Sequence, residues 1–211
     1  MEPVAIAVAL VLGFARAASP GPANAESIRR GRDGGGFRGA FLVQAGSLAG
    51  ELGWAALAIV GLEMMLQDGT LRLVLAVVGG VLLVGLGLAA LRYAATETGL
   101  PDIDPVVRRP GVGAFGTGVS FNGTSIAAPF VWLGIGSWLP RALPVGAGLG
   151  AAAGFIGLFA LGWLAWAVVL GGLAGGFGKR ITTGLIRVVD ALAGLALAAL
   201  GVLVLAGTLA R

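Results

Sequence analysis

The chain has 211 residues and a net charge of +4, and 57% of its residues are hydrophobic while only 11% are charged. Soluble domains usually carry about 25% charged residues, so a chain this poor in charge cannot cover a water-facing surface. Lipid suits the composition because it accepts apolar side chains on the outside of a protein. The basic residues lie in short loops, where membrane topology explains them without nucleic-acid binding.

Six apolar segments are long enough to cross a membrane, because a hydrocarbon core of about 30 Å needs roughly 20 helical residues. They cover approximately residues 3–25, 39–62, 71–93, 113–138, 143–174 and 183–208. We therefore predict an all-α polytopic membrane protein with six transmembrane helices. The fifth segment is long and rich in glycine, which favours a tilt or a break.

The segments divide into two groups of three within a single membrane domain, residues 1–211. Residues 1–93 form the first half, 113–211 the second half, and 94–112 a polar connector that includes Pro101 and Pro110. Because three is an odd number, the second half must enter the membrane upside down relative to the first. We therefore predict two inverted three-helix repeats.

Positive charge is unequally divided between the two sides of the predicted bundle. Ten of the fourteen basic residues fall on one side: Arg29, Arg30, Arg32, Arg38, Arg92, Arg108, Arg109, Lys179, Arg180 and Arg187. Basic loops stay in the cytoplasm. We therefore predict a multi-pass protein of the cell (inner or plasma) membrane with both termini outside, where Glu63 and Asp68 would fall in an external loop.

The first segment contains Ser19-Pro20-Gly21-Pro22, followed by Asn24. Proline removes a backbone donor and clashes with the preceding turn, so we expect the helix to break here. In transporters, broken helices often build the solute site. A harmless kink, or the cytoplasmic end of a shorter span, is the alternative.

The fourth segment has a comparable polar patch around Asn122, Thr124 and Ser125. The run from Gly13 to Pro20 parallels that from Gly116 to Gly123. Irregular patches at corresponding places in two halves point to a binding site. We therefore predict that the solute lies between the two breaks, and that one half rocks against the other.

Ionisable residues inside spans need a partner or a wet pocket. Gln44, Ser47 and Glu51 are spaced i, i+3 and i+7, so they share one helix face. The Glu51 carboxylate could bind a solute ammonium or exchange a proton. The alternative is a static ion pair with Arg16 that ties two helices together.

Three further charges have open roles. Arg16 could hold a solute carboxylate, or neutralise Glu51 or Asp190. Asp190, about two turns into the last segment, could reach the interface or pair internally. Glu26 stands close to Arg29 and Arg30, which favours a surface ion pair at the membrane edge.

The chain contains no cysteine and no histidine. This argues against zinc or soft-metal sites and removes the usual nucleophile–histidine pairs of hydrolases, so we predict neither a metal, a cofactor nor an enzyme. The tryptophans are interpreted as interface anchors or packing residues: Trp54, Trp132, Trp138, Trp163 and Trp166.

The motifs together resemble the LysE-type amino acid exporter family, which includes the homoserine and threonine exporters. The resemblance lies in the Pro20-Gly21-Pro22 motif, the basic loop from Arg29 to Gly39, the run from Gly46 to Glu51, Gly85-Leu86-Gly87 and the Leu91-Arg92 end. In the fourth segment Asn122 fits, but the proline and lysine that usually follow are absent, which indicates a divergent member.

This resemblance implies export of amino acids or similar small solutes, driven by the proton gradient. The predicted partners are a small amino acid-like solute and the lipid bilayer, while self-association of the chain stays open. A non-transporting membrane assembly or regulatory subunit, with its charges locked in static pairs, is the alternative function.

Overall fold

The computed structural model describes residues 3–65, 69–96, 112–125, 128–129, 131–132, 134–136, 148–176 and 183–209. All regular elements within these residues are helical, which confirms the all-α prediction for them. The elements are α1 (Pro3–Ala18), α2 (Pro22–Arg30), η1 (Gly31–Gly35), α3 (Gly36–Met65), α4 (Gly69–Thr96), α5 (Ala114–Gly123), α7 (Gly148–Gly176) and α8 (Thr183–Leu209). Most of the predicted connector lies outside the described residues.

Three of these helices, α4, α7 and α8, are each long and apolar enough to cross a membrane. A fourth span is obtained when α1 is counted together with the stretch Pro22–Ala58, although the two are bent by 69°. By length and composition, the described residues therefore provide three or four spans. The fifth predicted segment does not break in its described part, because α7 is one helix of 29 residues.

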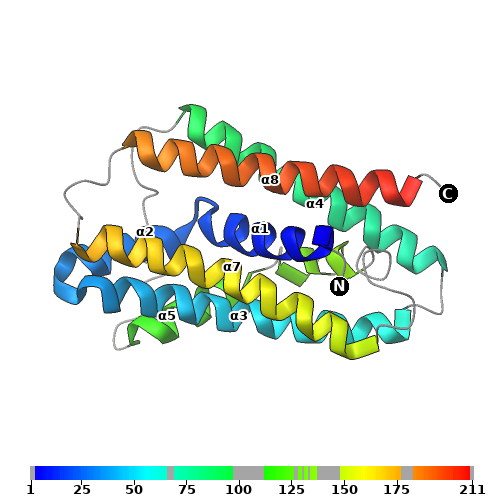
Figure 1. The fold of residues 1–211 in the computed structure, drawn as a ribbon, viewed down its shortest axis with the longest axis horizontal. Helices are drawn as coiled ribbons and strands as arrows, with labels where there is room; N and C mark the ends of the chain where they lie inside the picture. Colours follow the sequence, from blue (N-terminus) through cyan, green and yellow to red (C-terminus); the bar gives the residue numbers. More distant parts are fainter. Residues whose placement is uncertain are drawn as a thin grey trace.

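The chain reverses direction between α2 and α3 at a glycine turn. Asp33 and Gly34 leave the helical conformation, and Gly34 and Gly36 have φ angles of 93° and 52°. Only glycine adopts these angles without strain. Figure 1 shows the result, in which α3 runs back along the molecule beside α7.

The helices form two groups. Helices α4 and α8 pack closely on each other, and among the helices named above they meet the others chiefly where α8 contacts α1 (Figure 1). Gly134, in the helical residues 134–136, also lies against Gly79 of α4. The remaining helices form what we call the main bundle: α1, α2, α3, α5 and α7. Within it, α1 packs on α7, α3 packs on α5, and α3 packs on α7. The two groups are therefore joined by fewer contacts than hold each group together.

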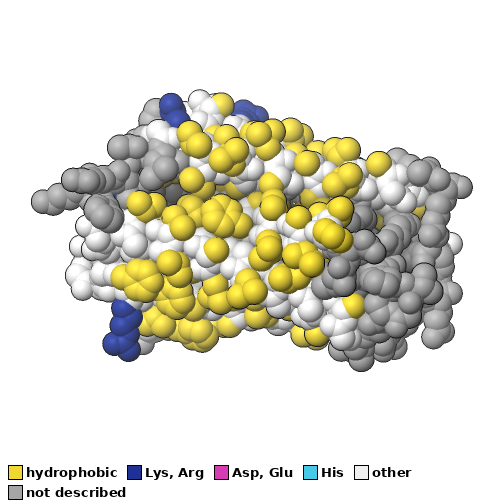
Figure 2. Space-filling model, viewed as in Figure 1, with side chains coloured by type: hydrophobic (Ala, Val, Ile, Leu, Met, Phe, Trp, Pro, Cys, Tyr) yellow, Lys and Arg dark blue, Asp and Glu magenta, His cyan; other side chains and the backbone are white. Residues whose placement is uncertain are grey.

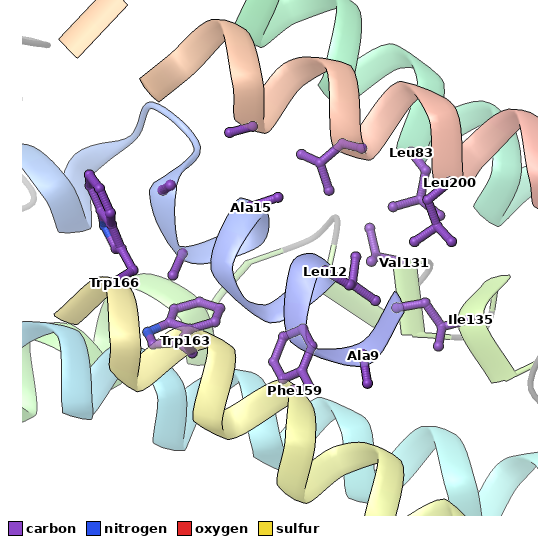
Figure 3. Close-up of a cluster of buried hydrophobic side chains, with 14 of the residues drawn as sticks. Ala9, Leu12, Ala15, Leu83, Val131, Ile135, Phe159, Trp163, Trp166 and Leu200 are labelled. Carbon is purple, nitrogen blue, oxygen red and sulfur yellow. The ribbon is translucent and has the colours of Figure 1, made fainter. Parts of the chain in front are cut away.

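The interior is apolar and aromatic, and Phe159 and Trp163 of α7 belong to the same buried cluster as Leu12 of α1 (Figure 3). The outer faces are apolar too. Leu57 and Leu161 are 63% and 57% exposed, and Figure 2 shows hydrophobic side chains across the middle of one face. Such a surface would be costly in water, whereas it suits a lipid environment.

The start of α1 and the end of α8 lie at the same end of the molecule (Figure 1). The basic residues in the last turn of α2, Arg29 and Arg30, lie at the other end, as does the first turn of α3. This separation agrees with the charge asymmetry of the sequence. Which end faces the cytoplasm stays a prediction.

Candidate functional site

The first predicted break is present. Helix α1 ends at Ala18 and α2 begins at Pro22, and Gly21 between them is fully extended, with φ and ψ both at 174°. Ser19 still closes the last turn of α1, because its Oγ donates to the carbonyl of Ala15 at 2.8 Å. The backbone therefore leaves the helix over only three residues.

Asn24 holds this break together. Its Nδ2 donates to the carbonyls of Ala17 and Ser19 at 3.0 and 2.8 Å, and these carbonyls are among those that the break leaves without a helical partner. Its Oδ1 accepts from Gln44 Nε2 at 2.8 Å and from Trp166 Nε1 at 3.0 Å. An amide has two donor hydrogens and two acceptor lone pairs, so the side chain of Asn24 is fully used.

Glu51 is a buried charge, at 1% exposed, and both of its oxygens have partners. Its Oε2 lies 3.3 Å from Nη2 of Arg16 and accepts from Nδ2 of Asn122 at 3.2 Å. Its Oε1 accepts from Nε1 of Trp132 at 3.1 Å. Arg16 precedes the first break by one turn, and Asn122 stands at the end of α5. The Glu51 carboxylate on α3 thus contacts one residue just before each break, Arg16 and Asn122.

The second break is marked by the end of α5 at Gly123. The backbone N–H of Ser125 donates to the carbonyl of Asn122 at 3.1 Å. Thr124 is exposed and its Oγ1 donates to the carbonyl of Ser120, at 2.7 Å. Of the three predicted residues here, only Asn122 reaches the charged centre by its side chain.

Gln44 and Ser47 lie beside Glu51 on α3, as their spacing predicted. Gln44 Nε2 also donates to Ser27 Oγ at 3.2 Å, and Ser47 Oγ donates to the carbonyl of Gly118 at 3.3 Å. Both side chains are at most 1% exposed. These contacts fasten α3 to α2 and to α5.

Three tryptophans belong to this polar interior rather than to the membrane interface. Trp132, Trp163 and Trp166 are buried, and their Nε1 atoms donate to Glu51, to the carbonyl of Gln44 and to Asn24 respectively. The sequence interpretation missed this role. The signal was available, because a buried indole N–H almost always needs an acceptor. Trp138 lies outside the described residues.

Glu26 forms the ion pairs that the sequence predicts, but it is buried, at 2% exposed. Its Oε1 lies 2.6 Å from Arg29 Nη2 and 2.7 Å from Arg30 Nε. Arg30 also donates from Nη2 to Thr117 Oγ1 at 2.9 Å. The cluster therefore joins the end of α2 to α5.

Two cavities adjoin the first break, at the boundary between the main bundle and the α4–α8 pair. The first, which we call the Arg16 cavity, has a volume of about 280 Å³. Its lining includes Arg16, Ser19, Pro20, Gly21, Ala90 and Tyr93. The second, which we call the Asp190 cavity, has a volume of about 80 Å³. Its lining includes Ala18, Pro20, Asn24, Tyr93, Trp166 and Asp190.

Asp190 differs from Glu51 in that one oxygen is free. The residue is 3% exposed, and its Oδ2 has no hydrogen-bond partner. Burial of an uncompensated carboxylate oxygen is costly, so such an atom is a marker of a site. Within the described residues, no three histidine, cysteine, aspartate or glutamate side chains are grouped so as to hold a metal ion.

The predicted site residues therefore fall into two sets. Those that line the two cavities are Arg16, Ser19, Pro20, Gly21, Asn24 and Asp190. Those in the interior or at the second break, where they line neither cavity, are Gln44, Ser47, Glu51, Asn122, Thr124 and Ser125. Pro22 begins α2.

Comparison with known proteins agrees with the resemblance stated from the motifs. A family model described as LysE type translocator matches residues 14–208. The chain is also similar to the chemotactic transduction protein ChpE of Pseudomonas aeruginosa, with 37% identity over 131 residues. The alignment covers 62% of this chain and 63% of that protein's length. No solved structure matches the chain.

Proposed function

Because this chain belongs to the family of LysE type translocators, we propose that it is a secondary active exporter of amino acids or related small solutes, coupled to the proton gradient. Members of the family are membrane transporters rather than enzymes. The observation that carries the proposal for this chain is the pair of cavities beside an interrupted helix, one lined by Arg16 and the other by Asp190.

The proposal includes six spans in two inverted repeats, which the backbone contacts of glycine support. In the pair of α1 and α7, a side chain on Gly13 would collide with the carbonyl of Phe159, and one on Gly162 with the carbonyl of Leu10. The backbones of α1 and α7 thus come close together at one glycine of each helix, Gly13 and Gly162.

The pair of α5 and α3 repeats this arrangement. Gly118 approaches the carbonyl of Val43, and Gly46 approaches the carbonyl of Phe115. In this comparison Gly13 of α1 corresponds to Gly118 of α5, whereas the sequence alone paired Gly13 with Gly116. The residue whose carbonyl is approached also lies at the same distance along each helix, because Leu10 is three residues before Gly13 and Phe115 is three residues before Gly118.

In the pair of α4 and α8, glycines of each helix likewise approach the backbone of the other helix. Gly87 and Gly194 approach each other's carbonyls, and so do Gly80 and Gly201. Gly87 would correspond to Gly201 and Gly80 to Gly194. A twofold relation between the halves would account for all three helix pairs together. The antiparallel course of α4 and α8, shown by the Gly87–Gly194 and Gly80–Gly201 contacts, supports an inverted second half.

For alternating access, we propose a movement of the α4–α8 pair against the main bundle. The sequence led us to expect that one half rocks against the other. However, α4 belongs to the first half and α8 to the second, and these two helices pack closely on each other. Both cavities lie along the less extensive contact between the pair and the main bundle, so this is where access would change.

Within this scheme the charged residues take different roles. Both oxygens of Glu51 are engaged, so it ties the two breaks together by charge pairing with Arg16. Arg16 Nε has no hydrogen-bond partner and Arg16 lines a cavity, so it is placed to bind a solute carboxylate. Asp190 has a free oxygen, so proton exchange is assigned to it.

A non-transporting regulatory or assembly subunit is the second candidate. It is favoured by the name of the relative from Pseudomonas aeruginosa, a chemotactic transduction protein. The saturated contacts of Glu51 would also suit a static bundle. The two candidates differ in whether the cavities ever open to both sides of the membrane.

Flux from proteoliposomes separates these functions. Vesicles loaded with radiolabelled amino acid mixtures are diluted into acidic buffer, so that protons flow inward. We expect efflux that a protonophore abolishes and that Asp190→Asn uncouples from the pH gradient. Protein-free vesicles and the surface variant Asp33→Asn are the controls. Efflux that never exceeds that of protein-free vesicles, from correctly folded protein, would favour the regulatory subunit.

A further inference from the structure

A groove in the outer surface lies at the boundary between the main bundle and the α4–α8 pair. Residues of α1, α7 and α8 form it, and we call it the α7–α8 groove. Figure 1 shows α1 between α7 and α8, and these two outer helices make few direct contacts with each other. The groove therefore occupies space that side chains of α7 and α8 would fill if the two helices packed together.

Small residues form the floor of the groove and large residues form its rim. Ala15 and Ala193 are buried at the bottom, while Val11, Leu161 and Leu192 are each more than half exposed along the edges. The lining residues that the structure describes are all apolar. Because the rim belongs to the apolar outer surface, the groove opens onto whatever covers that surface (Figure 2).

The depth of the groove in the membrane decides what can reach it. Gly162 stands midway along α7 and Ala196 midway along α8, and both residues line the groove. A helix of this length spans the hydrocarbon core of about 30 Å, so its midpoint lies near the centre of the bilayer. Neither water nor a lipid headgroup covers the protein at that depth. The occupant is therefore hydrocarbon, either an acyl chain of a lipid or an apolar helix of a second protein chain.

The shape of the groove favours the acyl chain over a helix. A helix with its side chains is about 10–12 Å across, and helices approach closely in lipid chiefly where small residues line the contact. Here the large side chains of Val11, Leu161 and Leu192 stand on the rim and keep a helix away from the floor. Gly162 is already used within the chain, because a Cβ there would collide with the carbonyl of Leu10.

The size of the groove suits one acyl chain. A volume of about 370 Å³ holds roughly twelve groups of about 30 Å³ each, the share of one water molecule in the liquid. A methylene group is of similar size, so a long segment of a single chain fits. Burial of each methylene group stabilises the complex by about 0.8 kcal/mol in water, but lipid tails already surround the chain outside the groove. Close packing, rather than the hydrophobic effect, would therefore hold the chain.

We propose that the α7–α8 groove holds one acyl chain of a bilayer phospholipid. The chain contacts Val11 and Leu161 on one side and Leu192 on the other, and it fills the space above Ala15 and Ala193. It thus takes the place of protein packing between α7 and α8, so that a lipid helps to join the α4–α8 pair to the main bundle. This inference does not require export, but any movement of the pair against the main bundle must displace or reorder the chain.

Photo-cross-linking in proteoliposomes tests the inference. Two phosphatidylcholines carry a diazirine on an acyl chain, one near the methyl end and the other near the ester, and each is mixed in trace amounts with unlabelled phosphatidylcholine. Mass spectrometry locates the labelled residues. Val81, midway along α4 and more than half exposed, is the control within the same protein. We expect the methyl-end probe to label the groove several-fold more than Val81, and the ester probe to show no such preference.

A variant that fills the groove locates the chain. Ala165 lines the groove and is exposed, so a larger side chain there occupies the groove without entering the core. We expect Ala165→Phe to lower labelling of the groove to the level of Val81. Ala56→Phe adds the same ring at an exposed position of α3 and should leave labelling of the groove unchanged. The comparison with Val81 uses the unaltered protein, so it does not depend on how either variant folds.

Two kinds of result overturn the inference. Equal labelling of the groove and Val81, or labelling of the groove that Ala165→Phe does not lower, would show that no chain is held there. Ala165→Cys tests the competing occupant, because the chain has no other thiol. Oxidation of this variant in the bilayer to a disulfide-linked dimer would place a second copy of the chain at the groove, whereas we expect it to stay monomeric.

Discussion

The guanidinium Nη2 of Arg16 lies 3.3 Å from Oε2 of Glu51, which links the end of α1 to the middle of α3. The same oxygen accepts from Asn122 at 3.2 Å. The segments before the two helix breaks, far apart in the sequence, are thus held by one buried atom. If either break moves during transport, this contact must either move with it or be released.

We predict that Arg16→Gln and Glu51→Gln each lower the free energy of unfolding by about 3–5 kcal/mol, because each leaves a buried charge without its partner. The double variant should lose less than the sum of the two. A double-mutant cycle by denaturant titration in detergent measures this, with tryptophan fluorescence as the signal. Additive losses would contradict a direct pair, and Asp33→Asn, at an exposed site, should change stability by no more than about 0.5 kcal/mol.

Asn24 is predicted to act through its two donor hydrogens, which bind the carbonyls of Ala17 and Ser19. Asn24→Asp retains the oxygen that accepts from Gln44 and Trp166 but cannot donate. We therefore expect Asn24→Asp to destabilise the protein at least as much as Asn24→Leu, by about 1–3 kcal/mol for each unsatisfied carbonyl. Melting temperatures of the two variants decide this. A nearly neutral Asn24→Asp would show that the acceptor side matters more.

Gly13 and Gly118 are predicted to tolerate no side chain, because a Cβ at either would collide with a backbone carbonyl. Overpacking of this kind costs about 1–3 kcal/mol or more. Gly13→Ala and Gly118→Ala should therefore lower the melting temperature by similar amounts, as expected for equivalent positions. Gly157→Ala on α7 is the matched control, since it has nothing within 4 Å and should be neutral or stabilising.

Cross-linking is predicted to stop transport when it joins the α4–α8 pair to the main bundle. Ala15 of α1 and Ala193 of α8 line the α7–α8 groove between the two groups. Because the chain has no cysteine, cysteines at these two positions would be the only thiols. A short bifunctional thiol reagent that both cysteines react with should abolish efflux, and single-cysteine variants should be unaffected. Undiminished efflux from the cross-linked protein would show that the two groups do not move apart there.

Several local features were predictable from the sequence because they depend on residues close together in the chain. The break at Ser19–Pro22 follows from proline chemistry, and the placing of Gln44, Ser47 and Glu51 on one face follows from helical periodicity. The roles of the tryptophans were not predicted. Whether an indole N–H meets lipid headgroups or a buried acceptor depends on which helix faces it, and this is not encoded in local composition.

The sequence by itself determined an all-helical protein with apolar spans, the first break and the need of each intramembrane charge for a partner. Apolarity, periodicity and proline could do this because they act over a few neighbouring residues. Only the tertiary structure decided the partners. Arg16 could have neutralised Glu51 or Asp190, and the packing of α1 and α3 on the same helix, α7, brought it to Glu51. Asp190 was thereby left with a free oxygen beside a cavity between α8 and the main bundle, and the proposed chemistry begins there.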